Sequence, residues 1–194
     1  MSASDDLMSA ALELVTERGP AGFTLREAAR RAGVSHATPG YLFGDLSGLL
    51  TQVALQGTRR FTAEMEAAQD HGATPIERLS AIGNAYVGFA RSEPHVFRLI
   101  VGDEYVDSAD PELAAARMAS EGPLRRAMAE TLGTDEETPE ILARVRLAWA
   151  TVHGVARLIL DGPFRGTPQS EQELAASVIA ALKPALVAPL SRIR

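Results

Sequence analysis

The chain has no cysteine, a single lysine (Lys183) and few aromatic residues, which make up 5% of its 194 residues. Without cysteine it can form neither a disulfide nor a thiolate metal site. No apolar run approaches the roughly 20 residues that a membrane-spanning helix needs. The stretch "MSASDDLMSA" is acidic, whereas a secretory signal begins with basic residues. We therefore expect a cytoplasmic protein that does not associate with a membrane.

A positive net charge is also missing. The formal charge of −6 argues against a general binder of polyanions, although it leaves a local basic surface open. No metal-ligand spacing connects the four histidines, and the sequence contains neither a phosphate-binding loop nor a nucleophile elbow. These absences indicate no catalytic residue, no metal and no cofactor, so we expect that the protein is not an enzyme. The histidines are His36, His71, His95 and His153.

The sequence does contain signals that mark where helices start. Three segments match a capping box, in which a hydroxyl and a carboxylate satisfy backbone donors reciprocally: 24–27, 74–77 and 170–173. Asp110-Pro111 and Thr138-Pro139 each place proline after a capping residue. Because β-branched alternation is absent, we predict an all-α fold. The expected helices cover 5–17, 24–32, 36–42, 46–70, 75–91, 94–101, 111–132, 139–161 and 171–188.

The second and third of these helices form a helix-turn-helix pattern. Ala28 and Ala29 give the second helix a face of small residues that another helix can approach closely. Gly33 supplies a left-handed residue for a tight turn, and Ser35 is predicted to cap the third helix. Two short helices joined by a turn of three or four residues are typical of DNA-binding proteins.

A proline and a glycine fall inside the predicted third helix. With Ser35 as the cap, Pro39 is the fourth helical residue, and we expect it to cost one hydrogen bond and a local kink. Pro39 lies four residues before Phe43 on the inward face, so we expect it to be buried against Val34. Gly40 then faces outward, where the missing side chain permits close approach of DNA.

The segment Ala10–Leu50, "AALELVTERGPAGFTLREAARRAGVSHATPGYLFGDLSGLL", resembles the N-terminal DNA-binding region of TetR-type repressors. The resemblance implies a helix-turn-helix three-helix bundle at 1–47 and a larger helical domain for ligand binding and dimerisation at 48–194. Two positions depart from the family, which usually has tyrosine at Gly40 and a phosphate-contacting lysine at Leu46. The residues that carry the resemblance are Gly19, Thr24, Ala28, Ala29, Gly33, Val34, Ser35, Thr38, Phe43, Leu49 and Leu50.

The predicted DNA-binding residues lie on or beside the outer face of the third helix. Ala37 and Thr38 can touch thymine methyl groups, and His36 can bond a base edge or a phosphate. Tyr41 can reach a phosphate, and Arg26 near the start of the second helix suits the DNA backbone. The full predicted set is Thr24, Arg26, Ser35, His36, Ala37, Thr38, Gly40 and Tyr41.

A second resemblance covers 146–164. It is similar to TetR-family C-terminal domains that carry a Trp-x-x-x-His-Gly motif, here Trp149, His153 and Gly154. Trp149 and His153 are one helical turn apart and share a face, so they can line a cavity for a ligand. The alternative is that both are packed core residues. The predicted ligand-binding residues are Tyr86, Phe89, Arg91, Phe97, Met118, Trp149 and His153.

Of the last two predicted helices, 139–161 is apolar on more than one face and therefore must be buried on more than one face, and 171–188 carries one apolar face. The resemblance implies that they pair with their copies in a symmetric homodimer, which would match a palindromic operator in double-stranded DNA. The predicted function is a ligand-responsive repressor that a small, mostly apolar effector releases from DNA. The alternative, supported by Gly40 and Leu46, is a helical small-molecule-binding protein that has lost specific DNA binding.

Overall fold

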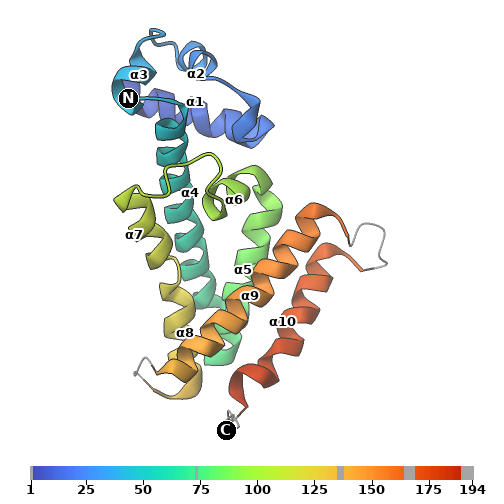
Figure 1. Ribbon diagram of the computed structural model, residues 1–194. Coiled ribbons are helices and arrows are strands. Elements are labelled where there is room, and N and C mark those ends of the chain that lie inside the picture. The colour runs from blue at the N-terminus through green and yellow to red at the C-terminus, as the bar shows by residue number, and fades with distance from the viewer. Residues whose placement is uncertain (1, 73, 135–137, 164–168, 189–194) are drawn as a thin grey trace. The chain divides into compact units, whose positions relative to one another are not determined.

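The computed structural model describes residues 2–72, 74–134, 138–163 and 169–188. These residues contain ten α-helices, two short 3-10 helices and no strand, so the all-α prediction is confirmed (Figure 1). None of the described helices is long and apolar enough to cross a membrane. The α-helices are α1 (Ala3–Arg18), α2 (Leu25–Arg31), α3 (Thr38–Phe43), α4 (Leu46–Ala68), α5 (Pro75–Ser92), α6 (Pro94–Val101), α7 (Pro111–Ala119), α8 (Gly122–Leu132), α9 (Pro139–Asp161) and α10 (Glu171–Val187); the 3-10 helices are Pro20–Gly22 and Gln69–His71.

The chain divides into two compact units. The first comprises Met1–Arg60 and Glu93–Ser120, and the second comprises Phe61–Ser92 and Glu121–Arg194. Helix α4 runs without a break from one unit into the other between Arg60 and Phe61. The domain boundary predicted after residue 47 therefore lies within the first unit, in the first turn of α4.

In the first unit, α1 packs against α2, α3 and α6. A Cβ added at Gly57 of α4 would lie 3.0 Å from both Val96 and Ile100, so this glycine lets α6 lie close to α4. The loop after α6 is also tied to α4, because the Thr51 hydroxyl accepts a hydrogen bond from the backbone N–H of Asp107 at 2.9 Å. The helix-turn-helix segment thus shares one packed unit with α6 and α7. Its fully buried side chains include Leu7, Leu14, Val15, Leu49, Val53, Val96, Phe97 and Leu113.

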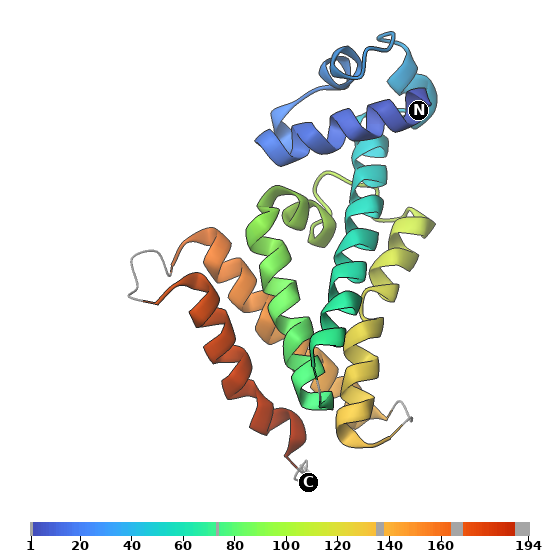
Figure 2. The same ribbon diagram turned by 180° about the vertical axis from the view of Figure 1, so that it is seen from behind.

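In the second unit, α5 packs against α8, α9 and α10. A Cβ at Gly83 of α5 would lie 3.2 Å from Ile179 and 3.3 Å from Val152, so three helices meet at this glycine. Helices α9 and α10 lie side by side (Figures 1 and 2). The buried guanidinium of Arg144 donates hydrogen bonds to the Leu186 and Ala188 carbonyls and so holds the end of α10 against α9.

The predicted helix at 111–132 is in fact two helices. Helix α7 ends at Ala119, and α8 starts at Gly122 with Pro123 as its second residue. Proline lacks an N–H and disfavours helical backbone in the residue before it, so Gly122-Pro123 starts a new helix. The predicted capping residues of α7, α9 and α10 are confirmed, because Asp110, Thr138 and Ser170 accept hydrogen bonds from their helix N-termini.

The junction between α3 and α4 permits only glycine at position 48. A Cβ added there would lie 2.0 Å from the Phe43 carbonyl oxygen, which is backbone and cannot move aside. Gly48→Ala is therefore expected to lower the free energy of unfolding by about 1–3 kcal/mol, as overpacking does elsewhere. The matched control is Gly88→Ala in α5, where nothing lies within 4 Å, and we expect it to stabilise by up to about 1 kcal/mol. Thermal unfolding of both variants measures this; equal effects would contradict it.

Candidate nucleic-acid interface and effector site

The turn after α2 is built as the sequence predicts. Thr24 caps α2 by accepting a hydrogen bond from the Glu27 N–H at 3.3 Å, although the Glu27 carboxylate accepts from Arg18 rather than completing a capping box. Gly33 has φ +69°, the left-handed conformation that glycine adopts without strain. The Val34 N–H then bonds the Ala29 carbonyl at 3.0 Å and closes the turn.

The start of α3 differs from the prediction. Ser35 does not cap it; helix α3 begins at Thr38, and Ala37 precedes it without a side-chain cap. Ser35 instead forms a turn, in which its carbonyl accepts from the Thr38 N–H at 3.1 Å and its Oγ lies 2.8 Å from Thr38 Oγ1. Pro39 is therefore the second helical residue rather than the fourth. Since that N–H has no partner within a helix, Pro39 costs no hydrogen bond.

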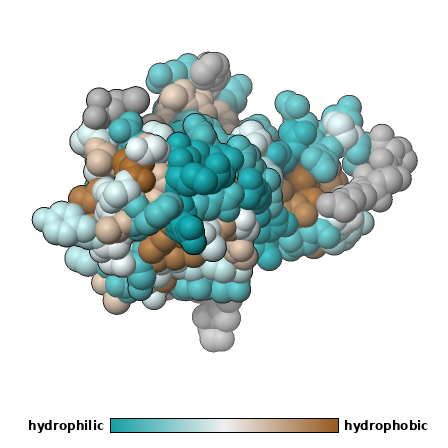
Figure 3. Space-filling model, turned by 90° about the horizontal axis from the view of Figure 1, so that it is seen from above, coloured by the Kyte–Doolittle hydropathy of each residue, from teal (hydrophilic) through white to brown (hydrophobic). Residues whose placement is uncertain are grey.

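Most of α3 faces away from the chain. Pro39 is buried, as predicted, and Gly40 is exposed with nothing within 4 Å of an added Cβ. The Tyr41 side chain is 90% exposed, and Leu42 is 40% exposed. Viewed onto α1–α3, the surface is largely hydrophilic with apolar patches between (Figure 3). Of the predicted DNA-binding residues, Thr38 is half-buried. The others are exposed: Thr24, Arg26, Ser35, His36, Ala37, Gly40 and Tyr41.

Residues 1–47 carry four arginines and six acidic residues, a net charge of −2. Two of the arginines are neutralised locally: Arg18 bonds Glu27 at 2.7 Å, and Arg31 bonds both oxygens of Glu17 at 2.8 and 2.9 Å. The hydrogen bond from Arg31 lowers the pKa of Glu17. Arg26 and Arg30 make no ion pair within the described residues, and both are exposed.

Arg30 is absent from the predicted DNA-binding set. It lies one helical turn after Arg26 on α2, so the two guanidinium groups share a side of that helix. This spacing of four residues was available in the sequence. The sequence could not show that Arg18 pairs with Glu27 and that Arg31 pairs with Glu17. These ion pairs leave Arg26 and Arg30 as the arginines of the described helix-turn-helix segment that have no acidic partner.

The start of α4 carries an acidic cap. The Asp45 carboxylate accepts a hydrogen bond from the Gly48 N–H at 2.8 Å. A helix N-terminus attracts anions, and here Asp45 already provides one. Together with Leu46, this leaves the first turn of α4 without the cation that the family resemblance implies.

In the second unit, three predicted ligand-binding residues come together. The Tyr86 hydroxyl lies 2.8 Å from His153 Nδ1, and the Trp149 ring stacks on the His153 ring at 5.0 Å with an interplanar angle of 15°. Tyr86 is buried, whereas the Trp149 side chain is 45% exposed. The cluster thus runs from the interior to the surface of the unit.

Phe61 of α4, which the sequence analysis did not select, extends this cluster inward. Its ring packs edge-on against Tyr86 at 5.0 Å and against Phe89 at 5.1 Å. We call Phe61, Phe89, Tyr86, His153 and Trp149 the aromatic cluster. Its members come from three helices, so sequence spacing alone could not have connected Phe61 to the others.

The other predicted ligand-binding residues have different surroundings. Arg91 forms an ion pair with Glu171 at 3.0 Å, at the start of α10. Phe97 and Met118 belong to the first unit, where Phe97 is fully buried and Met118 is 75% exposed. In the described residues no three His, Asp or Glu side chains gather as a metal site would require.

The stability of the second unit should depend on pH through His153. Burial, with a smaller effect of Arg157, lowers the pKa of His153, while burial raises the pKa of its partner Tyr86. A base with a lowered pKa binds fewer protons when folded. The stability it supports is therefore complete above the ordinary value of 6.5 and is lost as the pH falls below it.

We expect His153→Gln to reduce this dependence, because glutamine can bond Tyr86 but does not titrate. The measurement is urea unfolding of wild type and variant at pH values from about 7.5 to about 5. His95→Gln, in the first unit, is the matched control. A wild-type decline that persists unchanged in His153→Gln would contradict the assignment.

Comparison with known proteins agrees with this geometry. The bacterial regulatory protein family tetR matches residues 7–51, and the tetracyclin repressor-like C-terminal domain matches residues 79–182. The chain belongs to the TetR family. It is a TetR-family transcriptional regulator and not an enzyme.

Several solved structures share the fold. A Rhodococcus sp. RHA1 protein of unknown function is 30% identical, with a TM-score of 0.78 over 96% of this chain and 94% of that one. The TetR-family regulator PfmR of Thermus thermophilus is 21% identical, with a TM-score of 0.65 over 96% and 99%. The regulator FadR of Bacillus subtilis, solved with stearoyl-CoA, is 15% identical, with a TM-score of 0.71 over 95% and 99%. No curated protein matches the chain.

Proposed function

We propose that this TetR-family regulator is a repressor that binds a palindromic operator as a homodimer and is released by a mostly apolar effector. The observation that carries the proposal is the outer surface of α2 and α3. It presents the 90% exposed ring of Tyr41 on α3 and the exposed Arg26 and Arg30 on α2, which form no ion pair among the residues that the structure describes. Exposed aromatic and arginine side chains on a helix-turn-helix suit contacts with DNA.

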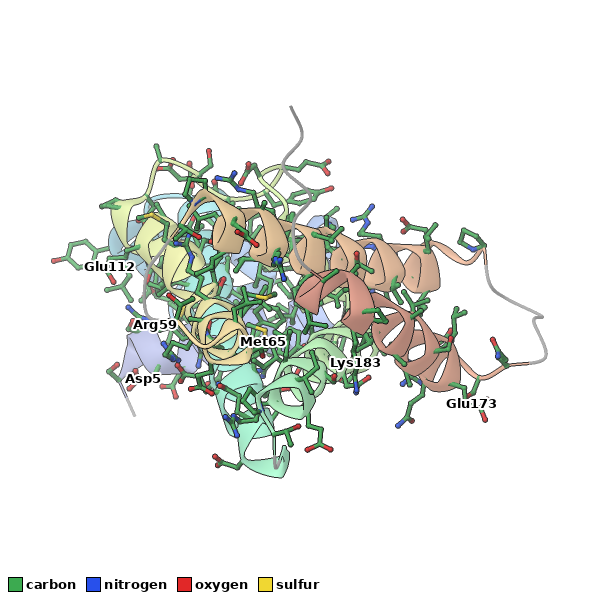
Figure 4. The ribbon with its side chains drawn as sticks, turned by 90° about the horizontal axis from the view of Figure 1, so that it is seen from below. Asp5, Arg59, Met65, Glu112, Glu173 and Lys183 are labelled. Atoms are coloured by element: carbon green, nitrogen blue, oxygen red, sulfur yellow. The ribbon has the colours of Figure 1, made fainter. Side chains whose placement is uncertain are left out.

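Helices α9 and α10 support the dimer. Leu147 and Leu158 are 44% and 43% exposed, and they lie three turns apart on one side of α9. Ala143 and Ala150 are exposed on the same helix, and Val187 is 49% exposed on α10. Figure 4 labels two polar side chains of α10, Glu173 near its start and Lys183 towards its end. An apolar surface on two adjacent helices suits a two-fold interface with a second copy.

The aromatic cluster supports an apolar effector. Its rings lead from the buried Phe89 and Phe61 to the partly exposed Trp149, and Tyr86 and His153 supply a polar pair among them. A structural neighbour, FadR of Bacillus subtilis, was solved with stearoyl-CoA, so this fold can accommodate a ligand that has a long apolar chain. An effector acts only if it prefers one dimer geometry over another. On our proposal the preferred geometry no longer fits successive major grooves.

The experiment is a selection from random duplex DNA with the full-length protein, followed by gel shifts of the selected sequence at two salt concentrations. The proposal expects a palindrome bound at least about 10³-fold more tightly than random DNA. The alternative, a helical small-molecule-binding protein that has lost specific DNA binding, expects no enriched sequence. The net charge of −2 over residues 1–47 makes that outcome a real competitor.

Trp149 is the only tryptophan, so its fluorescence reports on the aromatic cluster alone. We expect the dye 1-anilinonaphthalene-8-sulfonate, whose aromatic rings bind apolar sites, to bind near it and to accept excitation energy from the Trp149 ring. Trp149→Phe removes the energy transfer but keeps a ring on His153. Phe61→Ala is expected to weaken dye binding about tenfold or more, since it removes a buried ring. Leu113→Ala, at a fully buried position in the first unit, controls for a general loss of packing. Dye bound without energy transfer would place the apolar site elsewhere.

A further inference from the structure

Residues 35–42, "SHATPGYL", supply with all but the buried Pro39 the surface that α3 and the turn before it offer to DNA. This segment contains no arginine, lysine, asparagine, glutamine, aspartate or glutamate. Those are the side chains that make paired hydrogen bonds to guanine, adenine or cytosine in the major groove. The segment therefore lacks the usual means of reading bases by hydrogen bonds.

The hydroxyl groups in this segment are largely engaged within the chain. Ser35 Oγ and Thr38 Oγ1 bond each other at 2.8 Å. Thr38 lies at the first position of α3, and its hydroxyl is held by the turn. Its methyl group takes no part in this bond and is the apolar group that Thr38 can offer to a base.

The remaining exposed groups are mostly apolar. Ala37 exposes a methyl group, Leu42 is 40% exposed, and Tyr41 presents its ring together with a hydroxyl that suits a phosphate. Gly40 has no side chain and nothing within 4 Å, so it allows close approach. In the major groove the one apolar group on a base edge is the thymine 5-methyl.

We infer that this regulator reads its operator mainly through thymine 5-methyl groups, contacted by the methyl groups of Ala37 and Thr38, and not through hydrogen bonds to base edges. The inference rests on the proposed DNA binding and adds to it the chemical class of the operator. The half-site is expected to have thymines where α3 enters the major groove. The exposed arginines of α2 bind phosphates and add affinity without sequence preference.

The test replaces single thymines of the selected operator by deoxyuridine. This change removes only the 5-methyl group and keeps every hydrogen-bonding atom of the base. Each contacted methyl is expected to account for about fourfold in affinity, the equivalent of about 0.8 kcal/mol. Substitution of thymines outside the half-sites is the control and should have no effect.

Two variants of Thr38 separate methyl from hydroxyl recognition. Thr38→Val keeps a methyl group and removes the hydroxyl, and it should still distinguish thymine from deoxyuridine. Thr38→Ser keeps the hydroxyl and removes the methyl, and it should lose that distinction at one position. Loss of discrimination in Thr38→Val with retention in Thr38→Ser would overturn the inference.

His36 is the polar side chain that can oppose this conclusion, because it is exposed in the turn and can bond a base edge. If His36→Ala abolishes sequence preference while deoxyuridine substitution changes nothing, hydrogen-bond recognition carries the specificity and the inference is wrong. In that case the proposed repressor function stands. A protein that selects no sequence at all would overturn both.

Discussion

Leu147→Glu is expected to convert the protein from a dimer to a monomer and to reduce operator affinity by about 10²–10⁴-fold. The side chain is 44% exposed on α9, so a glutamate there is tolerated by the folded monomer. In the proposed dimer the same carboxylate would be buried against its own copy, without a cation to pair with it. A monomer binds only one half-site and loses the gain in affinity that comes from linking two half-site contacts, and this gain is about 10²–10⁴-fold.

The adjacent residue provides the control. Arg146→Gln makes the same change of net charge, but residue 146 points about 100° around α9 from residue 147. Analytical ultracentrifugation at micromolar concentration measures the dimer, and gel shifts measure operator affinity. We expect Arg146→Gln to behave as wild type in both. A dimer that persists in Leu147→Glu, or that dissociates equally in Arg146→Gln, would show that α9 does not form the interface.

Two wrong predictions of helix boundaries share one cause. Pro39 and Pro123 both stand at the second position of a helix, where their missing N–H costs nothing. The sequence alone predicted each proline inside a longer helix, so that α3 was predicted to start too early and α7 to continue into α8. Proline alone does not decide the matter, because Pro184 lies inside α10. Pro39 and Pro123 differ from Pro184 in the residues before them: Gly122 precedes Pro123, and Ser35 forms a turn before Pro39.

The site could be predicted in part for a similar reason. Exposure along α3 follows from helical spacing, so the outward position of Gly40 and Tyr41 was accessible from the sequence. Contacts between distant segments were not. The ion pair of Arg31 with Glu17 joins two helices, and the ring contact of Phe61 with Tyr86 joins two others. Neither contact leaves a recognisable pattern in the nearby sequence, because each depends on how the helices pack.

The second large effect concerns Arg26 and Arg30. Replacing both by alanine removes two exposed cations from each protomer and four from the dimer. If each neutralises one phosphate, the slope of log affinity against log salt becomes shallower by about 3–4, and affinity near 0.1 M salt falls by about 10²–10³-fold. The loss should be the same for every operator variant, because phosphate contacts carry no sequence information.

The matched control is Arg125→Ala with Arg126→Ala in α8, which changes the net charge equally. These arginines are engaged with Glu121 and Glu66, so their loss should leave the salt slope unchanged. Gel shifts at four salt concentrations, on the selected operator and on a mutated one, make the measurement. A slope lowered equally by both double variants would mean that overall charge, rather than the α2 surface, attracts DNA. A loss confined to one operator variant would mean that an arginine reads a base. Residues 1–47 are acidic overall. On the proposed function, the attraction of DNA to this segment therefore comes from the local positive charge of Arg26 and Arg30.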